Sequence, residues 1–188
     1  SVSTAAVDLV TKQIVEISKN GGKLFVCGNG GSAAISEHLS CDHSKGVCVD
    51  TNLRPFVVSL PSNVSLLTAL GNDIGYDYVF SKQIEWFAGP KDGLLIISSS
   101  GNSNNVVNAL KEAKKRGTKT MSLVGFNGGE AKNHSDICVH VKSDNYGIVE
   151  DSHQIIMHIM AQFIRKNHAI DRSSIKPVSY THLRAHET

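Results

Sequence analysis

The sequence lacks a long apolar run, an excess of charge of either sign, and a basic segment followed by an apolar one near Ser1. The first and third absences lead us to expect a soluble, cytoplasmic protein with no membrane partner. Its 19 basic and 17 acidic residues leave a formal net charge of only +2, and the basic residues are dispersed. We therefore expect no nucleic-acid partner.

The four cysteines include no CxxC pair, so the usual spacing of a zinc or redox motif is absent. The apolar surroundings of these cysteines, as in LFVCG and DICVHV, predict buried, reduced thiols at Cys27, Cys41, Cys48 and Cys138. Reduced thiols fit a reducing cytoplasm.

The length of 188 residues fits one domain, which we place at residues 1–168. A helical pattern is already under way at residues 3–22, so we expect the N-terminal helix to be truncated. Residues 169–188 have neither helical nor strand patterning. We expect them to be a disordered tail or a non-native extension.

Short runs rich in β-branched residues alternate with amphipathic stretches along the chain. We expect strands within residues 23–28, 55–60, 93–100, 118–126 and 136–142. The clearest helix follows the third run, with Ser103 as N-cap and Gly117 just past its end. This alternation predicts an α/β fold with a parallel sheet covered on both faces, whose ligands bind beyond the carboxyl ends of the strands.

Two of the expected strands end in loops that suit an anion. The first strand leads into Gly28-Asn29-Gly30-Gly31-Ser32, which lets backbone N–H groups approach a ligand at a helix start, although a plain tight turn is an equal alternative. The third leads into SSSGNSNN, where four hydroxyls and a helix N-terminus make a phosphate cradle, the alternative being a serine-rich turn with an N-cap. The hydroxyls belong to Ser98, Ser99, Ser100 and Ser103.

A possible metal and acid–base site comes from two helical stretches. His38 and Asp42 are four residues apart and share a helix face. Glu150, Gln154 and His158 form a polar stripe on a late helix, and imidazoles with carboxylates suit zinc or a similar ion. Glu150 and His158 are about 12 Å apart along an ideal helix. Both meet one ion only if Glu150 lies at an unwound helix start, or if different subunits contribute.

The alternative for these residues is a pair of core histidines with capping acids. Four other histidines have no comparable partners, and we expect surface or packing positions for them. They are His43, His134, His140 and His168.

Four segments in order resemble the signatures of SIS (sugar isomerase) domain proteins, and of phosphoheptose isomerases in particular. They are CGNGGSAAISEHLSCD, LTALGNDIGYDYVFSKQI, IISSSGNSNNVVNALKEAKKRG and GIVEDSHQIIMHIMAQFI, and the likeness spans roughly residues 1–166. The resemblance implies a flavodoxin-like three-layer sandwich with a five-stranded parallel sheet, in a homotetramer with active sites at subunit interfaces. It also implies conversion of sedoheptulose 7-phosphate to D-glycero-D-manno-heptose 7-phosphate through an enediol, for bacterial surface polysaccharides.

The resemblance also assigns roles to residues. Those matching substrate contacts are Asn29, Gly30, Ser32, Asp73, Ser98, Ser99, Ser100 and Ser103. Those matching ligands of a divalent metal, Zn2+ in the family, are His38, Asp42, Glu150 and His158. The resemblance places Asp42 at the position of the family's base. From the chemistry of isomerisation we expect Asp42 or Glu150 to remove the proton and His158 to relay a proton to oxygen.

This chain departs from the resembled family at three places. Asp42 stands where glutamate is usual, Glu150 stands where glutamine is usual, and residues 41–55 replace the segment that usually follows the base. Isomerisation of another phosphosugar is therefore an alternative. A second alternative is a non-catalytic module that binds a sugar phosphate or a replication initiator.

Overall fold

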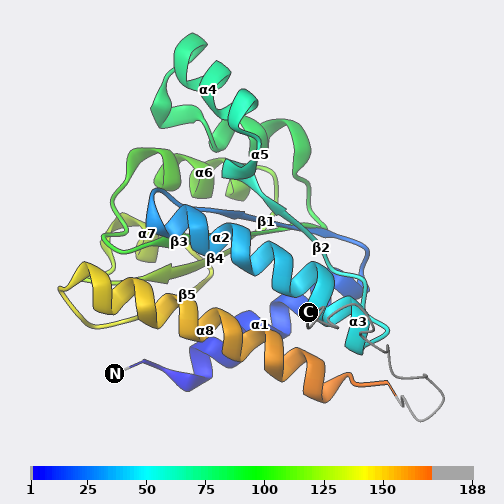
Figure 1. Cartoon of the computed structure of the whole chain (residues 1–188). Coiled ribbons are helices and arrows are strands. Elements are labelled where there is room, and N and C mark those ends of the chain that lie inside the picture. Colours follow the sequence, from blue (N-terminus) through cyan, green and yellow to red (C-terminus); the bar gives the residue numbers. More distant parts are fainter. Residues whose placement is uncertain (1, 171–188) are drawn as a thin grey trace, which may run out of the picture.

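The computed structural model describes residues 2–170, apart from the side chain of Asp50, and its centre is a five-stranded sheet (Figure 1). The strands are β1 (Lys23–Cys27), β2 (Phe56–Ser59), β3 (Gly93–Ser98), β4 (Lys119–Val124) and β5 (Ile137–His140). All neighbouring pairs are parallel, in the order β2-β1-β3-β4-β5. The five predicted strands and the parallel sheet are confirmed.

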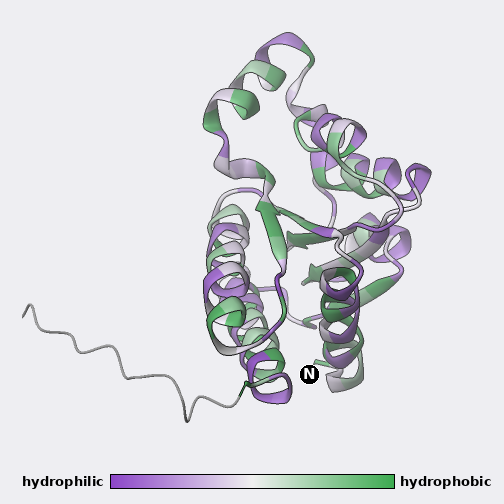
Figure 2. Ribbon diagram, turned by 90° about the vertical axis from the view of Figure 1, so that its right-hand side faces the viewer, coloured by the Kyte–Doolittle hydropathy of each residue, from purple (hydrophilic) through white to green (hydrophobic). Residues whose placement is uncertain are grey.

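Helices cover both faces of the sheet, as the view in Figure 2 also shows. One face carries α1 (Thr4–Lys19), α2 (Gly31–Cys41) and α8 (Tyr146–Asn167). The other carries α5 (Ser81–Phe87), α6 (Asn104–Lys115) and α7 (Gly129–His134). The predicted three-layer α/β architecture is therefore correct.

The remaining helical segments connect these layers. A π-helix, η1 (Asp42–Val47), and the short α3 (Cys48–Asp50) extend α2 toward β2. After β2, the chain passes through η2 (Leu60–Ser62) into α4 (Val64–Asp73) and η3 (Tyr76–Tyr78). Figure 1 shows α4 farther from the sheet than α5 and α6. No helix among residues 2–170 is long and apolar enough to cross a membrane.

Side-chain alternation along the central strands builds two apolar cores. In β1, Leu24 and Val26 pack with α1, α2 and α8, while Phe25 and Cys27 pack with α5 and α6. Strand β3 alternates in the same way and is buried throughout. A strand covered on both sides reads as a continuous apolar run, which is why its position could be predicted.

The strand order reverses between β1 and β3, because β1 pairs with β2 on one side and with β3 on the other. Ligands of doubly wound sheets bind in the crevice at such a reversal, outside the carboxyl ends of the strands. The two glycine- and serine-rich loops predicted from the sequence follow these two strands. The topology therefore brings them together.

The prediction of four buried thiols is wrong in part. Cys27 is buried, and burial raises the pKa of its thiol, but Cys48 and Cys138 are half-buried and Cys41 is exposed. Cys41 ends α2, whose buried residues are Ser32, Ile35, Ser36 and Leu39. Two residues past Leu39, the chain has turned to the solvent side of the helix.

The predicted tail at residues 169–188 falls outside the described residues except for its first two positions. Ala169 forms an isolated antiparallel bridge with Thr51.

Candidate functional site

The glycine turn, residues 28–31, follows β1 and leads directly into α2. A Cβ at Gly28 would lie 2.6 Å from the carbonyl oxygen of Ile97, so only glycine fits there. Gly30 has φ +54° and no atom within 4 Å of the position of a Cβ, so this side of the turn is open. Ser32 is buried, and its backbone N–H donates to the carbonyl of Asn29. The turn is fixed by close packing while its outer side leaves room for a ligand.

The serine loop, residues 98–103, follows β3. The hydroxyl oxygen of Ser98 accepts from the N–H of Gly101 at 3.1 Å, and that of Ser100 accepts from Asn102 at 3.3 Å. Because both oxygens serve as acceptors within the loop, each hydroxyl proton remains available to donate to a ligand. This arrangement suits phosphate oxygens, which are acceptors.

The other two serines of the loop differ. Ser99 is buried, and its hydroxyl makes no hydrogen bond among the described residues. Ser103 precedes α6 at the predicted N-cap position, but its hydroxyl makes no capping bond. The plain N-cap alternative therefore does not explain the Ser103 side chain.

His38, Asp42 and His158 form a cluster between α2, η1 and α8. Nε2 of His38 lies 3.6 Å from one carboxylate oxygen of Asp42, and Nε2 of His158 lies 3.5 Å from the other. One possible ligand atom from each residue lies within 4.8 Å of the others. Asp42 begins the π-helix, a local change of helix geometry that is frequent at functional sites. We call these three residues the triad.

Gln154 joins the two histidines of the triad. Its amide nitrogen lies 2.8 Å from Nδ1 of His38 and 3.4 Å from Nε2 of His158. The two imidazole rings meet edge to face, with centroids 4.9 Å apart. Sequence reasoning placed Gln154 in the polar stripe without giving it a role. Its spacing of four residues from His158 was the signal, because such residues share a helix face.

Glu150 is placed elsewhere. Its carboxylate lies beside Gly31, where a Cβ would approach the carboxylate oxygens to between 2.6 and 2.9 Å. Helix α8 is regular from Tyr146, so Glu150 is not at an unwound start. The carboxylate instead faces the N-terminus of α2, where a negative charge is favourable. Within one chain, Glu150 belongs with the glycine turn and not with the triad.

The predicted site therefore has two halves, which we call the loop half (the glycine turn and the serine loop) and the triad half. Helix α2 separates them, since it runs from the glycine turn at Gly31 to Cys41, immediately before Asp42. Its 11 residues span about 16 Å at 1.5 Å per residue. Asp73 lies in neither half, because it is exposed at the end of α4 and accepts a hydrogen bond from Asn72.

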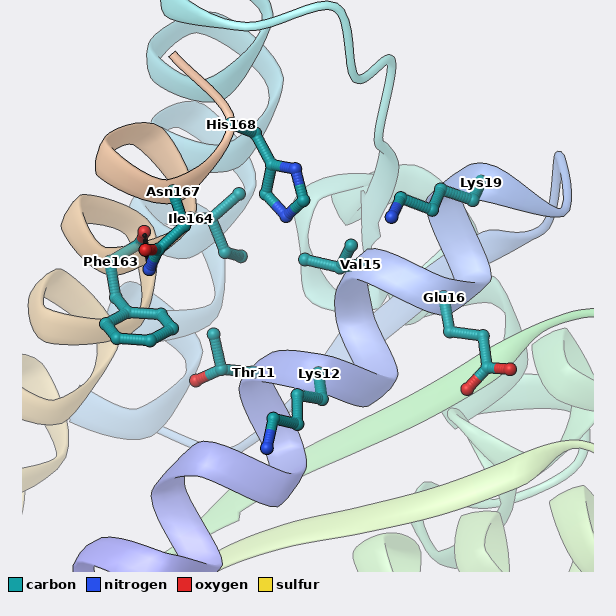
Figure 3. A pocket seen from close by; sticks show the side chains of 9 residues that line it. All are labelled: Thr11, Lys12, Val15, Glu16, Lys19, Phe163, Ile164, Asn167 and His168. Carbon is teal, nitrogen blue, oxygen red and sulfur yellow. Dashed lines mark hydrogen bonds between the residues drawn. The ribbon is translucent and has the colours of Figure 1, made fainter.

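Cavities accompany the triad half and the helices around it. A polar cavity of about 290 Å³ is lined by Asp42 and His158 together with Lys45 and Arg165. A larger one, of about 420 Å³, lies between α1 and the end of α8 (Figure 3). Figure 3 shows Thr11 and Lys12 on α1 on the side of Phe163 and Asn167 of α8, with the Glu16 side chain pointing away from them. This cavity contains none of the predicted site residues.

Two histidines are buried near the site. Burial lowers the pKa of His43 to about 4, against a smaller opposing effect of Asp42. Burial also lowers the pKa of His153 to about 4, against a smaller effect of the Val124 backbone. His43 agrees with the predicted packing role, and His153 was given no role. Both imidazoles are neutral at physiological pH.

Known proteins resemble this chain over most of its length. Two family models, both described as SIS domain, match residues 3–125 and 87–165. A phosphoheptose isomerase of Pelobacter propionicus is 41% identical over 154 residues, which cover 82% of this chain and 81% of the relative. One of Helicobacter pylori is 37% identical over 156 residues, 83% of this chain and 81% of the relative.

Solved structures agree with these sequence relatives. The structure of a phosphoheptose isomerase from Francisella tularensis is 32% identical, with a TM-score of 0.81, and the match covers 87% of this chain and 86% of that one. A phosphoheptose isomerase from Neisseria gonorrhoeae is 31% identical, with the same TM-score and the same coverage.

Proposed function

Because this chain belongs to the SIS domain family, we propose that it is an aldose–ketose isomerase that converts sedoheptulose 7-phosphate to D-glycero-D-manno-heptose 7-phosphate. The observation that carries this proposal is the presence in one chain of an anion-binding loop half and a triad of two imidazoles and a carboxylate. A module that only binds a sugar phosphate needs the anion-binding loop half and has no evident use for the triad.

The loop half holds the phosphate in this proposal. The hydroxyls of Ser98, Ser100 and Ser103 donate to its oxygens, and the N-terminus of α6 adds a favourable dipole. Asn29, Gly30, Ser32 and Ser99 border the sugar, and Asp73, which lies outside both halves of the chain, is proposed as a further contact. Phosphate binding far from the reacting carbons fixes the orientation of the substrate.

The triad half carries out the proton transfers. Isomerisation moves one proton between C1 and C2 of the ketose and another between their oxygens, by way of an enediol. Asp42 takes the proton from C1 and returns it to C2. His158 removes the proton from the C1 hydroxyl and gives it to the oxygen on C2. Asp42 and His158 lie 3.5 Å apart, so both can act on neighbouring atoms of one substrate.

We propose that His38, Asp42 and His158 also hold a divalent ion, with Zn2+ as the first candidate. Two imidazoles and one carboxylate suit zinc, and their ligand atoms are already within 4.8 Å of one another. A bound ion would polarise the carbonyl oxygen of the substrate. Since Glu150 lies apart within one chain, it would contribute as a ligand or base from a neighbouring copy.

The separation of the two halves supports active sites shared between copies, in a homotetramer. Helix α2 places a phosphate at the serine loop far from the triad of the same chain. Helix α8 also exposes a stripe of apolar side chains at helical spacing, Ile148, Ile155, Ile159 and Phe163. Some of these residues line a groove of about 410 Å³ against α1. Such a stripe is a natural contact surface between copies.

NMR of the protein with sedoheptulose 7-phosphate in D2O, with and without a chelator, tests the function. Deuterium entering beside the carbonyl, together with aldose formation, is the expected result, and its loss with the chelator would establish the metal. Parallel samples with other ketose phosphates separate this substrate from another phosphosugar. A metal-loaded tetramer that neither exchanges nor converts any of them would favour a binding role.

A further inference from the structure

Three side chains from distant segments meet at the glycine turn. The amides of Asn29 and Asn105 form a reciprocal pair, each donating to the oxygen of the other at 2.9 Å. The hydroxyl of Tyr76 donates to the same oxygen of Asn29 at 3.0 Å. Asn29 belongs to the glycine turn, Asn105 to the first turn of α6, and Tyr76 to η3.

One backbone group fixes the orientation of this whole network. The N–H of Val106 donates to the side-chain oxygen of Asn105 at 2.9 Å. Because the Asn105 oxygen accepts this N–H, the other end of the Asn105 amide is its nitrogen, which donates to Asn29. The atom of Asn29 that accepts this bond is therefore its oxygen. The Tyr76 hydroxyl contacts the same oxygen and must be a donor.

Counting hydrogen bonds then limits what Asn29 can offer to a ligand. Its oxygen accepts from both Asn105 and Tyr76, which uses both lone pairs. One N–H is used by Asn105, and the amide makes no further hydrogen bond among residues 2–170. The other N–H is the polar atom of this side chain that remains for a ligand. Asn29 can thus donate to a sugar phosphate but not accept from its hydroxyls.

The network also joins the two loops mechanically. Asn105 is 2% exposed, so its bonds to Asn29 are shielded from water and costly to break. It is the second residue of α6, directly after the serine loop. The glycine turn after β1 is therefore tied to the serine loop after β3 through one buried amide.

We infer that Asn105 and Tyr76 are positioning residues: they hold the Asn29 amide with one N–H directed to the ligand and keep the two loops at a fixed separation. This inference rests on the proposed function for the identity of the ligand. Neither residue needs to touch the substrate, since both act through Asn29.

Two variants test the inference, and a third serves as a matched control. Tyr76→Phe removes only the hydroxyl from an exposed ring, and Asn105→Ala removes the amide pair. Asn108→Ala is the control, because Asn108 lies on the same helix and donates at 3.0 Å to the backbone of Asp77, without contacting Asn29. The metal-loaded protein is assayed for KM and kcat with sedoheptulose 7-phosphate, and calorimetry gives the Kd if no turnover occurs.

We expect Tyr76→Phe to raise KM or Kd about fivefold and Asn105→Ala about 25-fold, as the loss of one and of two hydrogen bonds of similar strength suggests. The expected change in kcat is less than about twofold, because the triad is untouched, and Asn108→Ala should behave like the wild type. An effect within twofold for Tyr76→Phe, an equal effect in the control, or a fall in kcat at constant KM would each overturn the inference. Tyr76→Phe alone decides the matter if Asn105→Ala does not fold.

The wild-type protein separates this inference from the proposed function. Binding without conversion, weakened in the two variants, would overturn the isomerase and support the positioning role. Conversion of the sugar phosphate by the wild type, with unchanged KM and kcat in the two variants, would support the isomerase and overturn the positioning role. A wild type that neither binds nor converts the sugar phosphate would overturn both.

Discussion

The loop half is held by hydrogen bonds of 2.9 to 3.3 Å, most of them buried or partly buried, whereas the three residues of the triad contact one another at 3.5 and 3.6 Å and the 2.8 Å contact there is that of Gln154 with His38. The triad side chains are also more open to solvent, at 48% for His38, 39% for His158 and 32% for Asp42. The loop half is therefore built by the single chain. The triad half has its residues gathered but not tightly engaged, which suits groups that close on an ion, a substrate or a second copy.

This contrast predicts that damage to the triad half removes turnover without removing binding. His158→Asn keeps a polar side chain of similar size but cannot relay a proton at the same atom. We expect kcat to fall by about 10³-fold, within the range for loss of a general acid–base residue. Calorimetric binding of sedoheptulose 7-phosphate to the variant should stay within a few-fold of wild type. Near-normal turnover would remove His158 from the mechanism.

A hybrid experiment tests whether the two halves of one active site come from different copies. Ser103→Asp keeps a good N-cap residue but places a carboxylate where we propose that the phosphate binds, so this variant should be inactive. We expect subunits of Ser103→Asp and His158→Asn, mixed by unfolding and refolding, to regain up to about a quarter of wild-type activity.

The restored activity would come from sites that combine an intact loop half from one copy with an intact triad from another. If both halves of a site came from one chain, no mixture would contain an intact site and activity would stay at the level of the separate variants. Light scattering on the mixture confirms that hybrid oligomers have formed.

The buried His153 of α8 lies beside Val124 at the end of β4 and gives the stability of the fold a pH dependence. Its pKa is about 4 in the folded protein and near 6.5 in an unfolded chain. Above pH 6.5 the imidazole is neutral in both states and has no effect. As the pH falls from 6.5 to 4, only the unfolded chain takes up the proton, so the folded state loses up to about 3 kcal/mol.

His153→Leu removes this contribution, so its stability should fall less steeply between pH 6.5 and 4 than that of the wild type. Urea unfolding at fixed protein concentration and several pH values measures the difference. Parallel pH profiles for the two proteins would contradict the assignment, whatever the variant does to stability at pH 8.

Much of the fold could be predicted because it depends on local patterns. Short apolar runs such as Leu94–Ile97, bounded here by Gly93 and Ser98, favour buried strands, and the periodicity of α6 has a clear end at Gly117. Contacts between distant segments could not be predicted, as in the pairing of Asn29 with Asn105 across 76 residues.

The candidate site shows the same division between local and distant information. The i,i+4 spacing placed His38 beside Asp42 and Gln154 on the helix face of His158, but nothing local indicated that Gln154 would also reach His38. The position of Glu150 depends on how α8 packs against the start of α2, which a single sequence does not record. The π-helix at Asp42 likewise has no simple sequence signal.

Two glycines of the loop half provide the finest test of how rigidly that half is built, since both have positive φ but different surroundings. Gly101 has φ +68°, and a Cβ there would meet the backbone carbonyl oxygen of Gly128, whereas Gly30 has φ +54° and open space around it. We expect Gly30→Ala to cost about 1 kcal/mol of stability, the strain of the left-handed backbone alone. Gly101→Ala should cost about 2 kcal/mol or more, because the backbone must also shift.

The two glycine variants also separate the effect of backbone strain on stability from an effect on ligand binding. Gly101→Ala moves the serine loop and should weaken binding of sedoheptulose 7-phosphate, while Gly30→Ala loses less stability but adds a methyl group on the open side where the sugar would lie. Urea unfolding and calorimetry on both variants measure the two effects separately. If Gly101→Ala were as stable as Gly30→Ala, the loop would have to be able to move away from Gly128, and the loop half would be less rigid than its hydrogen bonds indicate.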